Sequence, residues 1–123
     1  YVRERLSKNN LIEQSNGESA LMYFEKERKQ NSIYILDEPE NSLSAESQLK
    51  LAKFIEDSIR FYNCQFIIST HSPFILSMKE ANIFDLDSTP VSNKKWTELN
   101  NVKLYHDFFK IHDNELKENI TIS

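Results

Sequence analysis

The seven residues from Ile33 to Pro39 constrain the fold of this chain more than any other stretch. Four apolar residues are followed directly by two carboxylates, Asp37 and Glu38, and then by a proline. A short apolar run that ends in this way is typical of a buried strand, and Pro39 cannot continue it as a paired central residue. The pattern therefore predicts a strand over Ile33–Asp37, with both acids at its C-terminal end.

A second stretch, Gln65–Pro73, repeats this design, because its apolar run ends in polar residues that include His71. It predicts a strand over Gln65–Ser69. Between the two stretches, apolar positions recur at helical spacing from about Ala45 to Tyr62, and Ser44 is placed to cap that helix. The order strand, helix, strand predicts a parallel sheet with a right-handed crossover. Because ligands bind at the carboxyl ends of such strands, we expect the two acids and the histidine to meet at one rim.

Capping signals and apolar spacing predict further elements on either side of this unit. These are helices over about Ser15–Lys29, Ser72–Met78 and Asn101–Ile111, and a third strand over Ala81–Leu86. The polar residues after His112 are expected to fray. The full order of strand, helix, strand, helix, strand predicts that the third strand extends the parallel sheet, in an α/β fold of one domain.

One residue type is scarce enough to limit the function, because Gly17 is the only glycine. A phosphate-binding P-loop, G-x-x-x-x-G-K-[ST], needs two glycines so that backbone N–H groups can wrap the phosphates. No window of the 123 residues supplies this motif. We therefore interpret the chain, which begins with Tyr1, as the C-terminal part of a longer protein, with a trimmed or processed start as the alternative.

Charge and cysteine content narrow the choice of partners and compartment. A formal net charge of −4 argues against a protein that binds nucleic acid over its whole surface, and DNA stays open only as a local partner. The single Cys64 cannot form an internal disulfide, which predicts a buried thiol in a reducing compartment. No apolar run reaches about 18 residues and no signal peptide is present, so we expect a cytoplasmic protein without a membrane span.

The predicted rim suits hydrolysis of a nucleoside triphosphate. That reaction needs a metal held against the β- and γ-phosphates and a group that orients the attacking water. Asp37 could hold Mg²⁺ through water, Glu38 could accept a proton from the attacking water, and His71 could bond the γ-phosphate. The alternative is that the acids only solvate a turn and the histidine caps the next helix. Their equivalent positions on two strands favour the catalytic interpretation.

Three segments carry a resemblance to a known family: Ser15–Ser19, Leu36–Ser44 and Ser69–Pro73. In this order they resemble the signature motif, the Walker B motif with its D-loop, and the switch histidine of an ABC-type ATPase head. The residues of these motifs are similar to those of the soluble ABC-like predicted AAA ATPases, which are related to SMC and DNA-repair heads. The resemblance implies a parallel-sheet P-loop NTPase half-domain. Residues 1–123 would then form the C-terminal part of a single ATPase domain whose P-loop segment is absent.

The resemblance also implies a role for each residue of the rim. Asp37 would be the Walker B metal ligand for Mg²⁺ and Glu38 the catalytic carboxylate. His71 would be the second catalytic residue, as the switch that contacts the γ-phosphate. ATP and Mg²⁺ would be the cofactors.

Residues of the signature motif and the D-loop would contact nucleotide across a dimer. Ser15 and Gly17 resemble the groups that contact ATP bound to a second subunit, and Ser44 closes the D-loop that links the two sites. By itself, the Ser15–Ser19 segment is better explained as an ordinary capping box, and only its place beside the other two segments favours the signature motif. Asn16 replaces the first glycine of the transporter signature, and Ser44 stands where many transporters have Asp. Both departures fit the soluble branch.

The function implied is Mg²⁺-dependent ATP hydrolysis in the full-length protein, with this fragment inactive alone. Its partners would be its own missing N-terminal P-loop segment and a second copy in a head-to-tail homodimer. The alternative is a non-enzymatic regulatory or docking fragment that pairs with a separate P-loop chain or a nucleic-acid processing partner.

Overall fold

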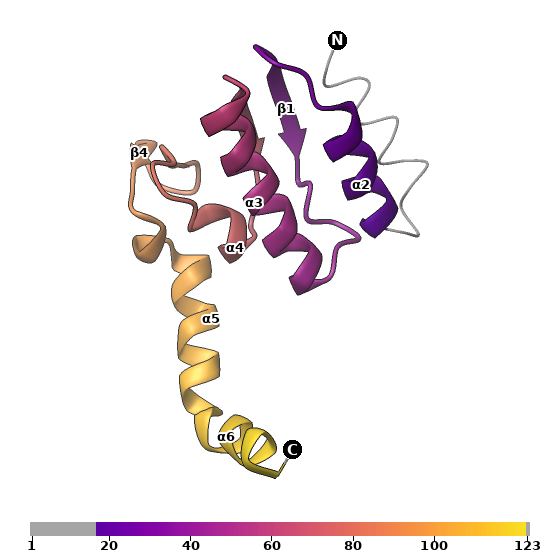
Figure 1. Ribbon diagram of the computed structural model, residues 1–123. Helices are drawn as coiled ribbons and strands as arrows, with labels where there is room; N and C mark the ends of the chain where they lie inside the picture. Colours follow the sequence, from indigo (N-terminus) through magenta and orange to yellow (C-terminus); the bar gives the residue numbers. More distant parts are fainter. Residues whose placement is uncertain (1–16, 123) are drawn as a thin grey trace. The chain divides into compact units, whose positions relative to one another are not determined.

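The computed structural model describes residues 17–122, with side-chain burial described for residues 21–118. The chain forms two compact units that divide between residues 79 and 80. The first unit contains, in chain order, α2 (Gly17–Glu27), β1 (Ile33–Asp37), α3 (Ala45–Phe61), β2 (Gln65–Ser69) and α4 (Pro73–Leu76) (Figure 1). None of the described helices combines the length and apolarity needed to cross a bilayer.

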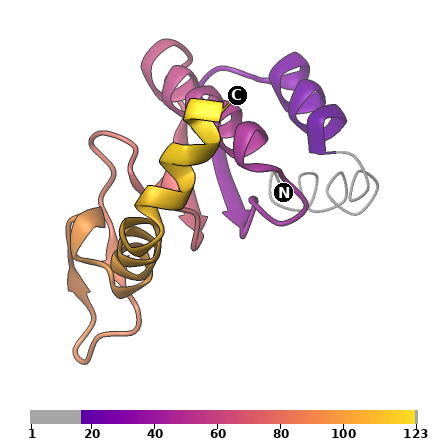
Figure 2. The same cartoon turned by 90° about the horizontal axis from the view of Figure 1, so that it is seen from below.

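Strands β1 and β2 form a two-stranded parallel sheet, as the sequence predicts. Both arrows point the same way in Figure 2. The register runs from Ile33 opposite Gln65 to Asp37 opposite Ser69, so the two strands end level with each other. The strand boundaries agree with those predicted, and Ser44 caps α3 as predicted.

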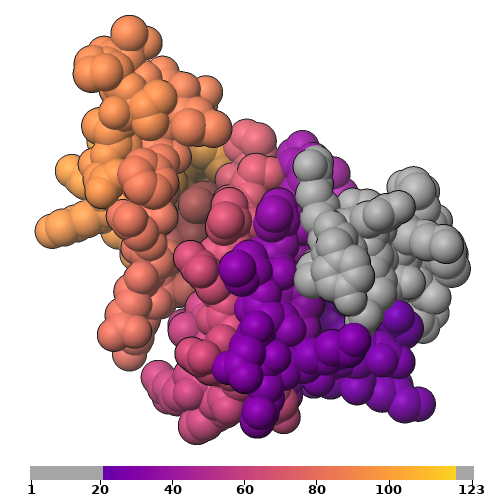
Figure 3. Space-filling model, turned by 90° about the horizontal axis from the view of Figure 1, so that it is seen from above, coloured from indigo at the N-terminus to yellow at the C-terminus, as the bar shows by residue number. Residues whose placement is uncertain are grey.

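The core of this unit lies between α2, α3, α4 and one face of the sheet. Figure 3 shows the indigo residues of the N-terminal part packed beside the pink residues of the later elements. The stacked rings of Tyr34 and Phe66, 4.9 Å apart, form the centre of the sheet's covered face. The buried apolar residues are Leu21, Tyr34, Leu36, Leu51, Phe54, Ile55, Cys64 and Ile75. Cys64 is therefore buried, as predicted.

Burial alternates along β1, which corrects the prediction of a strand buried throughout. Tyr34 and Leu36 face the core, whereas Ile33 and Ile35 on the other face are 54% and 40% exposed. On β2, Ile67 is 56% exposed. A continuous apolar run is typical of a strand covered on both faces, and within the described residues only one face is covered. This open apolar face is therefore formed by Ile33, Ile35 and Ile67.

Arg28 joins the end of α2 to α3. Its guanidinium lies 3.9 Å from the ring centroid of Tyr62 and 5.0 Å from that of Phe54. It also donates a hydrogen bond of 3.3 Å to the buried hydroxyl of Ser58. A planar cation between two rings contributes through cation–π attraction as well as packing, so Arg28 fixes how α2 lies on the helix that supports the sheet.

The second unit corrects two predictions from the sequence. It contains β3 (Phe84–Asp85), β4 (Ser92–Asn93), the 3-10 helix η1 (Trp96–Glu98), α5 (Asn100–Ile111) and α6 (Asp113–Ile122). The third strand predicted over Ala81–Leu86 is only two residues long, and it pairs antiparallel with β4 instead of extending the parallel sheet. An ion pair of 2.8 Å between Asp85 and Lys94 closes this hairpin locally.

The chain does not fray after His112, because α6 begins at the next residue. Asp113 and Lys117 form an ion pair of 2.9 Å at i,i+4 spacing, an arrangement that stabilises a helix. Helix α5 agrees with the prediction to within one residue at its start. Its apolar residues Leu104 and Phe108 are nevertheless more than half exposed.

Candidate active site at the carboxyl ends of the parallel strands

The two parallel strands deliver their polar residues to one edge of the sheet. Asp37 ends β1 opposite Ser69, which ends β2. The Ser69 hydroxyl donates a hydrogen bond of 2.6 Å to Oδ1 of Asp37. One residue further, the backbone N–H of Glu38 donates to the Ser69 carbonyl at 2.8 Å. These bonds extend the pairing of the strands beyond their last residues. They hold the Asp37 carboxylate and the Glu38 backbone in place.

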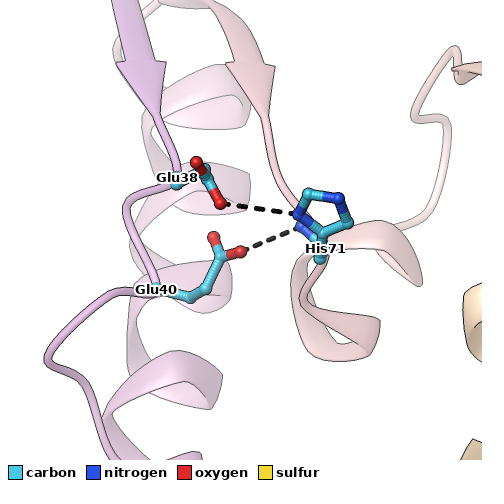
Figure 4. A group of neighbouring side chains, drawn as sticks. All are labelled: Glu38, Glu40 and His71. Atoms are coloured by element: carbon cyan, nitrogen blue, oxygen red, sulfur yellow. Dashed lines mark hydrogen bonds and ion pairs between the residues drawn. The ribbon is translucent and has the colours of Figure 1, made fainter. Parts of the chain in front are cut away.

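The predicted meeting of Glu38 and His71 is confirmed. Oε1 of Glu38 lies 3.5 Å from Nδ1 of His71, although the two residues follow different strands. Figure 4 shows the Glu38 carboxylate turned toward the imidazole. The side chains are 46% and 72% exposed, so both face solvent rather than the core. An arriving ligand can therefore contact them without opening the core.

The backbone at Glu38 makes this orientation possible. Its φ of 45° lies in the left-handed region, which non-glycine residues adopt rarely. The residue leaves the strand direction at once, and its carbonyl accepts a hydrogen bond of 3.1 Å from the Asn41 N–H. Residues held in this region cost about 1–3 kcal/mol each and cluster at functional sites. The turn thus directs the Glu38 side chain toward His71 in the turn after β2.

Glu40 is also part of the rim, although its residue pattern predicted no role for it. Its Oε1 accepts a hydrogen bond of 2.6 Å from the Thr70 hydroxyl, and its Oε2 accepts one of 2.9 Å from the His71 N–H. Glu40 therefore links the turn after β1 to the turn after β2. The signal that could have found it is a third carboxylate two residues beyond Glu38, across Pro39, at the same rim.

Two serines anchor the helices that follow these turns. The Ser44 hydroxyl accepts a hydrogen bond of 3.2 Å from the Ser47 N–H and so caps α3. Buried Ser72 caps α4 through the Ile75 N–H and donates 2.6 Å to Oε1 of Gln48 on α3. The role of Ser44 in binding nucleotide remains a prediction, since its hydroxyl acts here as a helix cap.

The predicted signature motif is only partly described. Gly17 is the first residue of α2, where a glycine leaves the helix N-terminus open to close approach. Ser15 lies outside the described residues. The geometry of the rim therefore depends on Asp37, Glu38 and His71, with Glu40 added to them.

Two metal-binding arrangements are available at the rim. Asp37 presents an exposed carboxylate at the strand end, with one oxygen held by Ser69. Separately, Glu38, Glu40 and His71 each offer one ligand atom, and these three atoms lie within 4.8 Å of one another. The rim thus carries three carboxylates within four residues, beside one imidazole.

The rim lies within a segment that matches a known protein family. Residues 6–76 match the AAA ATPase domain, which is more than half of the chain. This chain belongs to the AAA ATPase domain family. The matched part of the AAA ATPase domain contains both parallel strands and the whole rim, whereas the second unit lies beyond it. No curated protein and no solved structure matches the chain.

Membership of the AAA ATPase domain family supports an ATPase-type function with nucleotide binding. The mixed α/β unit with its small parallel sheet is compatible with a P-loop NTPase-like fold. In such folds the ligand lies beyond the carboxyl ends of the strands, and that is where the acids and the imidazole converge in this chain.

Proposed function

We propose that this chain supplies the hydrolytic half of an ABC-type ATPase site, acting on Mg²⁺·ATP that a P-loop presents to it. The observation that carries the proposal is the convergence of Asp37, Glu38 and His71 at the carboxyl ends of two adjacent parallel strands. Family membership supports the reaction class. The assignment to the ABC-type branch rests on the order and spacing of the motifs.

Asp37 would hold Mg²⁺, through water, at the start of the rim. Its Oδ1 already accepts a hydrogen bond from Ser69, so the carboxylate has a fixed orientation before any ion arrives. Supporting hydrogen bonds of this kind are a common way of orienting metal ligands. Mg²⁺ keeps several waters and binds one or two carboxylates together with substrate phosphates, which suits a ligand at an exposed strand end.

Glu38 would act as general base toward the attacking water, and His71 would contact the γ-phosphate. Their separation of 3.5 Å would let both groups reach one bound phosphate. A base must lie within reach of the proton that it removes, and the left-handed turn at Glu38 brings its carboxylate there. His71, from the turn after β2, would supply the imidazole for that contact.

Electrostatics require a cation in this site. Asp37, Glu38 and Glu40 would all lie near a triphosphate bound at this rim, and carboxylates repel phosphate oxygens. A divalent cation would replace this repulsion with attraction, because it binds carboxylate and phosphate oxygens together. The proposed activity is therefore strictly Mg²⁺-dependent.

A second polypeptide segment must provide the phosphate cradle, since none of the 123 residues forms a P-loop. We propose that this segment, from the same protein or from a separate chain, also covers the open apolar face of Ile33, Ile35 and Ile67. The half-exposed isoleucines support this, because removing apolar surface from water is favourable by about 25 cal/mol per Å², which offsets part of the cost of association. Head-to-tail pairing of two such heads around ATP completes the proposal.

Calorimetry with ATP and hydrolysis assays test the proposal. The 123-residue chain alone should bind ATP weakly, whereas the chain joined to a P-loop-bearing segment should hydrolyse ATP only when Mg²⁺ is present. Micromolar ATP affinity of the chain alone would contradict the need for a separate cradle. A complex that forms but never hydrolyses ATP would instead favour the docking function considered from the sequence.

A further inference from the structure

We propose that Glu38, Glu40 and His71 form a binding site for a divalent transition metal ion, with Zn²⁺ as its best match. This site is distinct from the proposed Mg²⁺ position at Asp37. It uses one ligand atom from each of three residues, and all three atoms lie within 4.8 Å of one another. Figure 4 shows the two carboxylates approaching the histidine from the same side.

The separation of the first two ligand atoms is compatible with a shared ion, and the convergence of a third ligand distinguishes this group from a simple histidine–carboxylate pair. Zn²⁺ bonds to imidazole nitrogen and carboxylate oxygen at about 2.1 Å, and a tetrahedral angle then places two ligand atoms about 3.4 Å apart. Oε1 of Glu38 and Nδ1 of His71 are 3.5 Å apart. The same distance is long for a hydrogen bond, which is strongest near 2.9 Å.

The donor set selects the class of metal. Carboxylate oxygen suits Mg²⁺, Mn²⁺ and Zn²⁺ alike, whereas imidazole nitrogen suits Zn²⁺, Cu²⁺, Fe²⁺ and Ni²⁺. Two carboxylates and one imidazole therefore favour a transition metal over Mg²⁺. Three protein ligands leave the fourth tetrahedral position for water or a phosphate oxygen.

The ligands are held in place before an ion arrives. Glu40 accepts hydrogen bonds from the Thr70 hydroxyl and the His71 N–H, so its carboxylate cannot swing away from the histidine freely. The backbone of Glu38, from which its carboxylate extends, is held by hydrogen bonds to Ser69 and Asn41. Binding would thus require small side-chain rotations and no rearrangement of the two turns.

The other two histidines of the chain provide a matched comparison. His112 lies 2.8 Å from Glu115, and His106 lies 3.5 Å from Asp107. Neither pair belongs to a group of three potential metal ligands in the part of the chain that the structure describes. These two histidines each lie beside a single carboxylate, so they serve as controls for metal binding at His71.

The site has a regulatory consequence that rests on the proposed function. An ion held by Glu38 and His71 would occupy the two groups assigned to hydrolysis, so Zn²⁺ would inhibit the ATPase even with Mg²⁺ in excess. Metal binding itself needs no nucleotide and no P-loop. The two proposals can therefore fail separately.

The test is a Co²⁺ titration of the 123-residue chain without nucleotide, followed by absorption spectroscopy and displacement with Zn²⁺. We expect one Co²⁺ per chain and displacement by Zn²⁺, with no displacement by millimolar Mg²⁺. His71→Ala and Glu40→Gln should each weaken binding by about tenfold or more, because even residues that only support metal ligands commonly contribute about 10- to 100-fold.

The control His112→Ala should bind Co²⁺ as the wild type does, since its imidazole faces a single carboxylate. Circular dichroism would verify that each variant keeps its helices, and exposed His71 can be replaced without disturbing the core. Unchanged affinity in His71→Ala would overturn the proposal. Equal loss in His112→Ala, or displacement of Co²⁺ by Mg²⁺, would overturn it as well.

Discussion

The backbone N–H of His71 donates a hydrogen bond of 2.9 Å to Oε2 of Glu40. The other oxygen of the same carboxylate accepts 2.6 Å from the Thr70 hydroxyl. A single side chain from the turn after β1 thus holds the first two residues of the turn after β2. Glu38 and His71 face each other because Glu40 fixes the distance between the turns that carry them.

Replacing Glu40 should destabilise the first unit. Glu40→Ala leaves the Thr70 hydroxyl and the His71 N–H without their charged acceptor, and we expect a loss of about 1–3 kcal/mol in the free energy of unfolding. Urea denaturation of the chain measures this loss. Glu25→Ala removes an exposed acid from α2 and should change stability by less than about 0.5 kcal/mol. Equal stabilities of the two variants would contradict the linking role of Glu40.

Ser69 should tune the affinity for Mg²⁺. Ser69→Ala removes the hydroxyl that orients Oδ1 of Asp37, so the Mg²⁺ concentration for half-maximal ATP hydrolysis should rise by about tenfold. The assay uses the chain completed by a P-loop segment, with Ser92→Ala in the second unit as control. A lower maximal rate with an unchanged Mg²⁺ requirement would show that Ser69 acts other than through Asp37.

Two isoleucines of α3 separate core packing from surface exposure. Ile55 has no exposed area, and Ile59, one turn later, is 48% exposed. Ile55→Ala should lower the free energy of unfolding by about 2–5 kcal/mol, because it removes buried methyl groups and leaves a cavity. Ile59→Ala should cost less than about 1 kcal/mol. Similar losses in urea denaturation would contradict the packing of α3 on the sheet.

The hairpin of the second unit should depend on pH. The Lys94 ammonium, and then the Asp87 N–H, hold the pKa of Asp85 below its ordinary 3.8. Its contribution to stability is therefore full above about pH 4 and is lost as the pH falls through the lower folded value. Asp85 in turn raises the pKa of Lys94 above 10.5, so that contribution is lost only in strong alkali.

Asp85→Asn should consequently destabilise the hairpin at neutral pH, and its difference from the wild type should shrink toward pH 2. Hydrogen exchange of the Lys94 amide, which bonds the Ile83 carbonyl across the hairpin, reports this locally. Glu118→Gln, an exposed change in the same unit, is the control. A difference that stays constant from pH 7 to pH 2 would rule out the ion pair as its source.

Local signals made the first unit predictable. The apolar runs before Asp37 and Ser69 set the strand boundaries, and the Ser44 cap set the start of α3. Parallel pairing of the strands then brought Glu38 beside His71, which no local signal alone could do. The apolar residues Ile33 and Ile35 predicted a strand covered on both faces. Within residues 21–118, only one face of β1 is covered.

Contacts between distant residues were beyond the reach of the sequence. Glu40 gains its place through bonds to Thr70 and His71, about thirty residues away, and nothing in the turn that carries it reveals those partners. In the second unit, the chain turns back after β3 and pairs with β4 as an antiparallel hairpin. The apolar residues around Ile83 gave no sign of this pairing. The residues after His112, which were expected to fray, form α6, where Asp113 pairs with Lys117 at i,i+4 spacing.

ATP hydrolysis by Glu38→Gln in the protein completed by a P-loop segment tests the central claim most directly. If Glu38 is the general base, the variant should still bind Mg²⁺·ATP, remain as an ATP-bound dimer, and turn over about 100-fold or more slowly. Glu25→Gln on α2 should keep the wild-type rate. Hydrolysis by Glu38→Gln at the wild-type rate would contradict the role assigned to the rim.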